Sequence, residues 1–333
     1  MLAAGAASAD TYRIATFAAP LSRDGPGLLL RDLIKGEDAT VKATIDVIAH
    51  IAPDILVLTD FDYDLDGAAL ALFADRFGAQ FPHQFALQPN SGMPTGRDID
   101  ANARLGDARD AQGFGRFAGD GGMAILSRFP ILTEDVVDHS KLLWADLPGA
   151  ILPQTAAGPF FDEGTLAILR LSSTGHWIVP VTLPDGLPVS LLAHAATPPV
   201  FDGPEDMNGL RNRDELRLWR AVLDGRFGTA PSSFVVAGNA NLDPSGGQGF
   251  SEAMAGFLSD PRLQDPLPGQ ATADWPDDDA GNLRVSYVLP SRDWTVTDAG
   301  VFWPAPDDPQ AALLGDDGLA AGVHHLVWVD ISR

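Results

Sequence analysis

The sequence predicts a single domain of the α/β class, in which strands and helices alternate. Segments with strand-like and helix-like patterns follow one another along 333 residues, and no linker or internal repeat separates them. Hydrophobic residues make up 45% of the chain, which is enough for a large packed core. Alternation of this kind is typical of sheets covered by helices. We therefore expect one domain over residues 11–333.

The strands and helices are expected where the hydrophobic side chains repeat with the matching period. Residues 13–17 alternate as a strand, and residues 41–51 have helical spacing up to Pro53. The next strand, 54–60, is almost continuously apolar, which is typical of a strand covered on both faces. In chain order, the remaining expected elements are a helix at 68–77, strands at 122–127 and 188–193, a helix at 214–223, and strands at 233–237, 284–289 and 325–331.

Two stretches between these elements, 88–121 and 243–282, are rich in Gly, Pro and Asp. Both exceed ordinary loop lengths, so we expect functional loops or partly mobile insertions that frame the open end of the sheet.

The N-terminus, residues 1–10, resembles the end of a secretory signal, with a small-x-small pattern at Ala7-Ser8-Ala9. It lacks a charged start and most of an apolar core, so a flexible alanine-rich tail is the alternative. We expect a periplasmic or secreted protein. No later stretch approaches the roughly 20 apolar residues of a membrane span.

The charge of the chain restricts its partners. Its 45 acidic and 22 basic residues give a formal net charge of -23, which repels phosphate backbones and makes nucleic acid an unfavourable partner. The chain has no cysteine, which excludes disulfides, thiolate metal sites and cysteine nucleophiles.

The turn Gly238-Asn239-Ala240-Asn241-Leu242-Asp243-Pro244 directly follows the strand expected at 233–237, so its polar side chains lie at a strand end. Six segments, this turn included, together resemble the endonuclease/exonuclease/phosphatase superfamily. They are 13–17, 53–58, 122–131, 238–244, 283–290 and 324–329. The run at 197–206 is similar to a bacterial, often exported, branch of that superfamily.

This resemblance implies a four-layer α/β/β/α sandwich, two mixed sheets face to face with helices outside, and an active site at one edge. It also implies catalysis by one or two divalent ions, an Asp that activates water and two His that stabilise the transferring phosphoryl group.

Most positions that match the family's site differ from its pattern. Ala18 stands where the first strand normally ends in Asn, and Asp60 replaces a metal-binding Glu. Ala195 stands where a His is expected, and His194 is displaced by one residue, so we expect it on the opposite face of its strand.

The C-terminal half has similar replacements. Asn239 replaces the Asp of the turn, although Asn241 is kept. Ser286 replaces an Asp in the following strand, and Val323 replaces the Asp before the catalytic-type His, which is kept as His324.

Of the acids that the family brings to its site, Asp60 alone is left by this alignment, and one carboxylate is a poor cage for Mg²⁺. Each lost electrostatic group typically costs about 100-fold in rate. We therefore expect a weakly active or inactive member, a pseudoenzyme that acts by binding a small anionic ligand or a protein.

The alternative is a phosphomonoesterase or phosphodiesterase that uses Mg²⁺ or Mn²⁺ on a small soluble substrate. Asp60 would hold the metal, Asn241 would contact phosphate and His324 would stabilise the transition state. Replacement ligands would come from Asp62, Asp64, Asp243 or Asp265. A nuclease ranks third because of the charge.

Two acidic runs resemble calcium loops. Asp98, Asp100 and Asn102 place oxygen ligands at alternate positions, but glycine is missing at the sixth position, so a solvated loop is the alternative. The run 62–67 has Phe73 where a calcium loop needs its last Glu, and an acidic turn before a helix explains it better.

One basic cluster is present in this acidic chain. Arg213, Arg217 and Arg220 share a helical face and either meet an anionic ligand or balance Asp214 and Glu215.

Overall fold

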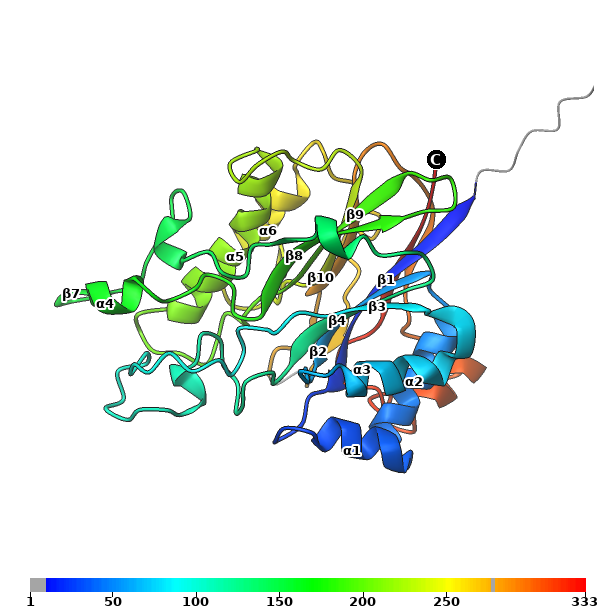
Figure 1. The fold of residues 1–333 in the computed structure, drawn as a ribbon, viewed down its shortest axis with the longest axis horizontal. Coiled ribbons are helices and arrows are strands. Elements are labelled where there is room, and N and C mark those ends of the chain that lie inside the picture. The colour runs from blue at the N-terminus through cyan, green and yellow to red at the C-terminus, as the bar shows by residue number, and fades with distance from the viewer. Residues whose placement is uncertain (1–9, 277–278) are drawn as a thin grey trace, which may run out of the picture.

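The computed structural model describes residues 10–276 and 279–333. Two mixed β-sheets pack face to face, and helices cover their outer sides (Figure 1). This is the four-layer arrangement that the sequence predicts. The signal-like segment, apart from Asp10, lies outside the described residues.

The first sheet has six strands in the order β14-β15-β1-β2-β4-β3. Its central strands β1 and β2 run parallel, and the other neighbours pair antiparallel. Helices α1, α2 and α3 cover its outer face (Figure 1). The bounds are β1 (Thr11–Leu21), α1 (Leu28–Lys35), α2 (Ala39–Ile51), β2 (Ile55–Phe61), α3 (Ala68–Ala74), β3 (His83–Phe85), β4 (Gly122–Ser127), β14 (Thr295–Val301) and β15 (Val327–Ser332).

The second sheet has five strands in the order β13-β10-β9-β8-β5. Helices α5 and α6 pack on its outer face (Figure 1). The bounds are β5 (Val137–Asp138), β8 (Gly175–Thr182), β9 (Pro188–Ala195), α5 (Met207–Leu223), β10 (Phe234–Asn239), α6 (Ser251–Leu258) and β13 (Ser286–Pro290).

Short elements occupy the connections. They are the pairs β6 (Gln154–Thr155) with β7 (Gly158–Pro159) and β11 (Ala273–Asp274) with β12 (Asn282–Leu283), the helix α4 (Glu163–Leu166), and 3₁₀ turns at Asp75–Gln80, Ala108–Asp110, Thr133–Asp135, Trp144–Asp146 and Pro309–Leu314. Within the described residues, no helix is both long and apolar enough to cross a lipid bilayer.

The side-chain alternation of β2 explains its apolar sequence. Leu56 and Leu58 pack under the helices, whereas Ile55 and Val57 face the second sheet. Both faces of the strand are therefore buried, as its composition predicts.

Some elements differ from the sequence-based expectation. The helix expected at 214–223 begins earlier, at Met207. The hydrophobic pattern does not predict its first turns, because the polar residues Arg211 and Asn212 are buried there through hydrogen bonds. The stretch 243–282 contains helix α6, which its Gly- and Pro-rich flanks conceal. Strand β8, with a proline at its centre, was also not expected.

The long stretch at 88–121 crosses the edge of the sandwich. Isolated β-bridges join Ser91 to Gly113 and Pro94 to Ala111, which closes the stretch on itself. Gly113 lies against the carbonyl of Ser173, where an added Cβ would be 1.8 Å from that oxygen. The stretch is thus held close to the end of β8.

Candidate functional site

Three of the positions at which the family resemblance predicts a replaced residue are direct neighbours. Asn239, at the end of β10, pairs with Ala195 of β9 on one side and with Ser286 of β13 on the other. All three are buried, and the hydroxyl of Ser286 has no hydrogen-bond partner. This patch carries no acidic and no basic side chain.

A chain of contacts connects this patch to the other sheet. Ala195 pairs with Gly175 of β8, and a Cβ at Gly175 would lie 2.8 Å from the terminal methyl of Met123. Met123 pairs with Thr59, and Thr59 pairs with Ala18. Ala18 and Ala195 therefore lie at the same edge of the sandwich.

His324 lies near this edge but outside a regular strand. It forms an isolated bridge with Ala273, and its ring meets Trp275 edge-on at 5.2 Å. Burial lowers its pKa to about 4, and its Nδ1 has no partner. The preceding Val323 accepts a backbone hydrogen bond from Asp274. A neutral histidine without an orienting carboxylate is a poor stabiliser of anionic charge.

His325 points elsewhere. Its ring stacks on Trp303 with centroids 4.0 Å apart, and burial lowers its pKa to about 4. The sequence predicts a strand from residue 325, but β15 begins only at Val327.

The two amides of the turn bond to the backbone. Asn239 Oδ1 accepts from the backbone N–H of Asn241 at 3.0 Å, and Asn241 Nδ2 donates to the carbonyl of Ala196 at 2.8 Å. Asn241 has a positive φ of 50°. The amides thus stabilise the turn.

His194 lies on the opposite face of β9 from Ala195, as the one-residue displacement predicts. Its ring packs on His176 and Trp219, on the side covered by α5. Neither of its ring nitrogens has a partner, and burial lowers its pKa to about 4. It therefore does not replace the family's catalytic histidine.

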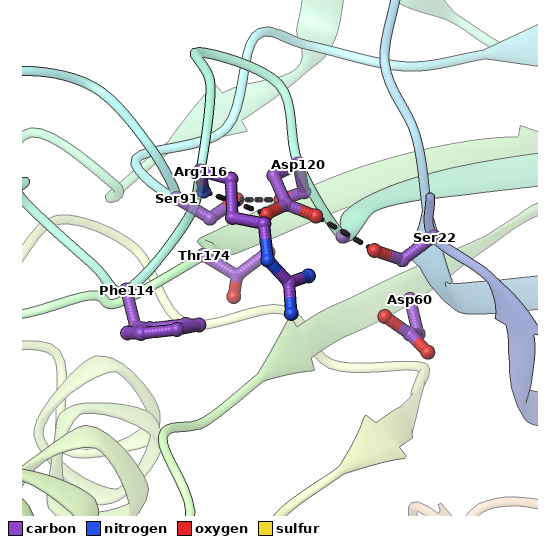
Figure 2. Close-up of a pocket in the computed structure, with 8 residues that line it drawn as sticks. Ser22, Asp60, Ser91, Phe114, Arg116, Asp120 and Thr174 are labelled. Atoms are coloured by element: carbon purple, nitrogen blue, oxygen red, sulfur yellow. Dashed lines mark hydrogen bonds between the residues drawn. The ribbon is translucent and has the colours of Figure 1, made fainter. Parts of the chain in front are cut away.

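A pocket of ≈ 280 Å³ opens at this edge (Figure 2). Its walls come from the ends of β1 and β2, from the stretch at 88–121 and from the residue before β8. The lining residues are Ser22, Asp60, Ser91, Phe114, Arg116, Asp120, Gly121 and Thr174.

Asp60 lines this pocket and is exposed to solvent, although many protein atoms also surround its carboxylate. Its backbone is left-handed, with φ 62°. Burial, together with the charges of Asp62 and Asp120, raises the pKa of Asp60 to about 7. Among the described residues, no donor forms a hydrogen bond with this carboxylate.

The other two carboxylates near Asp60 are occupied by protein donors. Asp120 accepts from the Ser22 hydroxyl at 2.6 Å and from the backbone of Arg116 at 2.7 Å (Figure 2). Asp62 accepts from the backbone N–H groups of Gly121 and Arg23. Burial raises the pKa of Asp62 to about 6. Of these three carboxylates, Asp60 alone accepts no hydrogen bond from the described residues.

The expected replacement ligands do not gather at Asp60. Asp64 accepts from the first backbone N–H groups of α3, Asp243 accepts from its own turn and from Arg284, and Asp265 pairs with Arg284. None of these three carboxylates lines the pocket at Asp60, and metal binding by them stays a prediction. Asp62 alone lies beside Asp60.

The pocket offers few protein ligands to a divalent metal ion. In the described part of the chain, Asp98, Asp100 and Asp110 are the only acidic or histidine side chains that bring three ligand atoms within 4.8 Å of one another. Mg²⁺ is usually held by one or two carboxylates together with waters and substrate phosphates, and the pocket offers one carboxylate that accepts no hydrogen bond from the described residues.

The acidic loop at 98–110 differs in detail from the calcium loop expected. The third carboxylate is that of Asp110, while Asn102 uses its amide to donate to Asp100 and Asp107. Asp98 accepts from the backbone of Asn102 and Ala103. The loop thus satisfies its own acceptors.

The basic cluster on α5 is structural. Arg213 and Arg217 both pair with Asp214, at 2.6 and 3.0 Å. Arg220 lies 3.9 Å from Asp260. Glu215 is not balanced by these arginines. It accepts instead from Ser173 and Thr197, at 2.6 and 2.8 Å from their backbone nitrogens.

Sequence reasoning missed most of the pocket. Ser22, Ser91, Phe114, Arg116 and Asp120 match no motif and have no periodic pattern. The one usable signal was Asp120-Gly121-Gly122, an acid and two glycines immediately before a strand.

Comparison with known proteins agrees with this architecture. Residues 23–328 match the sequence profile described as the Endonuclease/Exonuclease/phosphatase family. The chain therefore belongs to the endonuclease/exonuclease/phosphatase family. A search of curated proteins found no match.

Solved structures with the same fold are distant in sequence. An endonuclease/exonuclease/phosphatase from Beutenbergia cavernae is 19% identical, with a TM-score of 0.57, and the match covers 97% of this chain and 71% of that one. Sphingomyelinase C from Streptomyces griseocarneus is 15% identical, with a TM-score of 0.51 and coverages of 96% and 99%. D. rerio TDP2 in complex with a single-strand DNA product is 13% identical, with a TM-score of 0.53 and coverages of 97% and 99%.

Proposed function

We propose that this protein is a family member with very low phosphoesterase activity, which acts by binding a small molecule at the edge of the sandwich. The observation that carries the proposal is the neutral patch of Ala195, Asn239 and Ser286, which lies at the same edge as Ala18. In-line attack on a phosphate needs cations against the developing charge and a base that orients water. This patch supplies neither.

The remaining polar groups support the same reading. Asp60 is a single free carboxylate, and His324 is neutral and unoriented. Each missing electrostatic group typically lowers the catalytic rate about 100-fold. Even if these losses in rate are strongly non-additive, little turnover remains.

The test is hydrolysis of a phosphomonoester, a phosphodiester and single-stranded DNA, each with Mg²⁺, Mn²⁺ or Ca²⁺. The native protein is compared with a restored variant that carries Ala18→Asn, Asp60→Glu, Ala195→His, Asn239→Asp, Ser286→Asp and Val323→Asp. We expect the restored variant to exceed the native protein by about 100-fold or more.

The control is Asp60→Asn in the native background, which should leave the residual rate unchanged. A smaller variant, Asn239→Asp with Ser286→Asp, covers the case in which six changes prevent folding, and thermal melting followed by circular dichroism reports on folding. Robust metal-dependent turnover by the native protein, abolished in Asp60→Asn, would contradict the proposal and favour a rearranged metal site.

A further inference from the structure

The pocket at Asp60 combines groups of opposite charge. The carboxylate of Asp60 and the guanidinium of Arg116 come from different walls and point into the same space (Figure 2). They belong to β2 and to the stretch at 88–121 respectively. A ligand that satisfies both must itself carry both charges.

Asp60 requires a donor from the ligand. The neighbouring carboxylates already accept bonds from Ser22, Arg116, Gly121 and Arg23, whereas Asp60 accepts none. A partner of opposite charge favours the ionised form of such a carboxylate. An organic ammonium meets this need, because it carries three N–H donors of its own.

The residue opposite Asp60 is a glycine, so no side chain from that position fills the space beside the carboxylate. Gly121 faces the carboxylate, and a Cβ at that position would lie 3.1 Å from Asp60 Oδ1. The hydroxyl-bearing residues Ser22 and Thr174 line the same space and can accept further ammonium hydrogens.

Arg116 is available for an anionic group. Its side chain is 53% exposed, and its ion pair is with Asp24, whose side chain is 85% exposed, at 3.2 Å. Such surface pairs contribute little, so a ligand carboxylate can replace Asp24. A planar guanidinium binds a carboxylate through two parallel hydrogen bonds. A phosphate dianion is disfavoured because Asp60, Asp62 and Asp120 all lie close.

Phe114 supplies an apolar wall. Its ring is 62% exposed although it is a large hydrophobic side chain, and it lines the pocket next to Arg116. An occupant that covers this ring would remove apolar surface from water. The volume of ≈ 280 Å³ is near the lower end of small-molecule pockets, which are about 300–1,000 Å³.

We propose that this pocket binds a free α-amino acid with an apolar side chain, with the ammonium on Asp60, the carboxylate on Arg116 and the side chain against Phe114. The inference rests on the proposed function, because a hydrolase would hold a metal ion at Asp60. The family resemblance implies a small anionic ligand, whereas the ligand proposed here is a zwitterion.

The test is isothermal titration calorimetry of the full chain with L-phenylalanine as the probe. Phenethylamine lacks the carboxylate, and N-acetyl-L-phenylalanine lacks the ammonium. We expect L-phenylalanine to bind and each analogue to bind about tenfold more weakly, the usual effect of a lost charge-assisted hydrogen bond.

Two variants assign the contacts. Asp60→Asn should weaken L-phenylalanine about tenfold and leave N-acetyl-L-phenylalanine unchanged. Arg116→Gln should weaken L-phenylalanine similarly and leave phenethylamine unchanged. Asn accepts the left-handed backbone of position 60, so this variant should fold. Asp298→Asn and Arg292→Gln are exposed control changes that should alter nothing.

Three outcomes would overturn the inference. They are no binding of L-phenylalanine at millimolar concentrations, equal binding of the three compounds, and unchanged binding in Asp60→Asn. Low phosphoesterase turnover in the same samples would leave the proposed function standing. Conversely, native turnover together with amino-acid binding would contradict the proposed function alone.

Discussion

Gly238 allows the backbones of β10 and β9 to pack closely at the edge where the candidate site lies. It pairs with His194 across β10 and β9, and its φ is 153°. A Cβ on this residue would lie 1.9 Å from the carbonyl oxygen of His194. The glycine of the turn is therefore required by close packing of two backbones, whatever the chemistry of the neighbouring Asn239.

We predict that Gly238→Ala destabilises the protein by about 3 kcal/mol, because rigid backbone must move to admit the methyl group. Urea unfolding followed by tryptophan fluorescence measures the effect. Gly256→Ala is the matched control, since Gly256 lies within helix α6 with no atom near its added Cβ. The control should stabilise the protein by about 1 kcal/mol. Equal effects at the two positions would show that the turn can relax.

Helix α5 shows how one element positions the loops around the site. Its buried face is polar: the Arg211 guanidinium donates to the carbonyls of Leu171 and Arg170, and Glu215 accepts from Ser173 and Thr197. Burial raises the pKa of Glu215 to about 7, and the nearby Arg211 opposes the rise. The residues before β8 and after β9 are thus attached to one rigid helix.

The acidic turn before α3 gives a second prediction. Asp64 accepts from the backbone N–H groups of Ala68 and Ala69 at 2.9 and 2.8 Å, so it satisfies donors that the helix leaves free. Asp64→Ala should lower the free energy of unfolding by about 0.5–2 kcal/mol. Asp66→Ala, an exposed acid two residues away, should change it little. If urea unfolding shows similar losses of unfolding free energy in both variants, the stabilisation comes from the local negative charge and not from the hydrogen bonds of Asp64 to the helix.

Across the whole molecule, burial of histidines makes folding sensitive to acid. His176 and His194 lie between β8, β9 and α5, and burial lowers the pKa of His194 to about 4 and that of His176 well below its ordinary value. The unfolded chain binds protons at these residues below about pH 6.5, while the folded protein does not. Their stabilising contribution is therefore complete above pH 6.5 and is lost as the pH falls towards 4.

We predict that His194 accounts for about 3 kcal/mol of lost stability between pH 6.5 and 4. Urea unfolding at several pH values should show a smaller pH dependence in His194→Leu than in the native protein. Glu215 acts in the opposite sense, since its raised pKa removes stability as the pH rises from about 4.5 through about 7. An unchanged acid dependence in His194→Leu would mean that the ring is solvated in the folded state.

Much of the fold could be predicted because its strands carry their own pattern. The apolar runs of β2, β4 and β10 identified central strands within one or two residues. The replaced positions Ala195, Asn239 and Ser286 could be recognised individually, because each follows or begins such a strand. Helix α6 and strand β8 were not predicted, because glycine and proline obscured their periodicity.

The sequence by itself predicted alternating strands and helices from local patterns, and its motifs predicted the family and, through that resemblance, the two-sheet architecture. The replacement of the family's catalytic acids stays a prediction of the same resemblance. Only the tertiary structure decided which acids remain free. Asp243 and Asp265 bond to Arg284, whereas Asp60 faces an open pocket with Arg116 and Phe114. The physical reason is that a carboxylate's role depends on the donors that surround it. Here those donors come from segments far away in the sequence, brought together by packing of the two sheets.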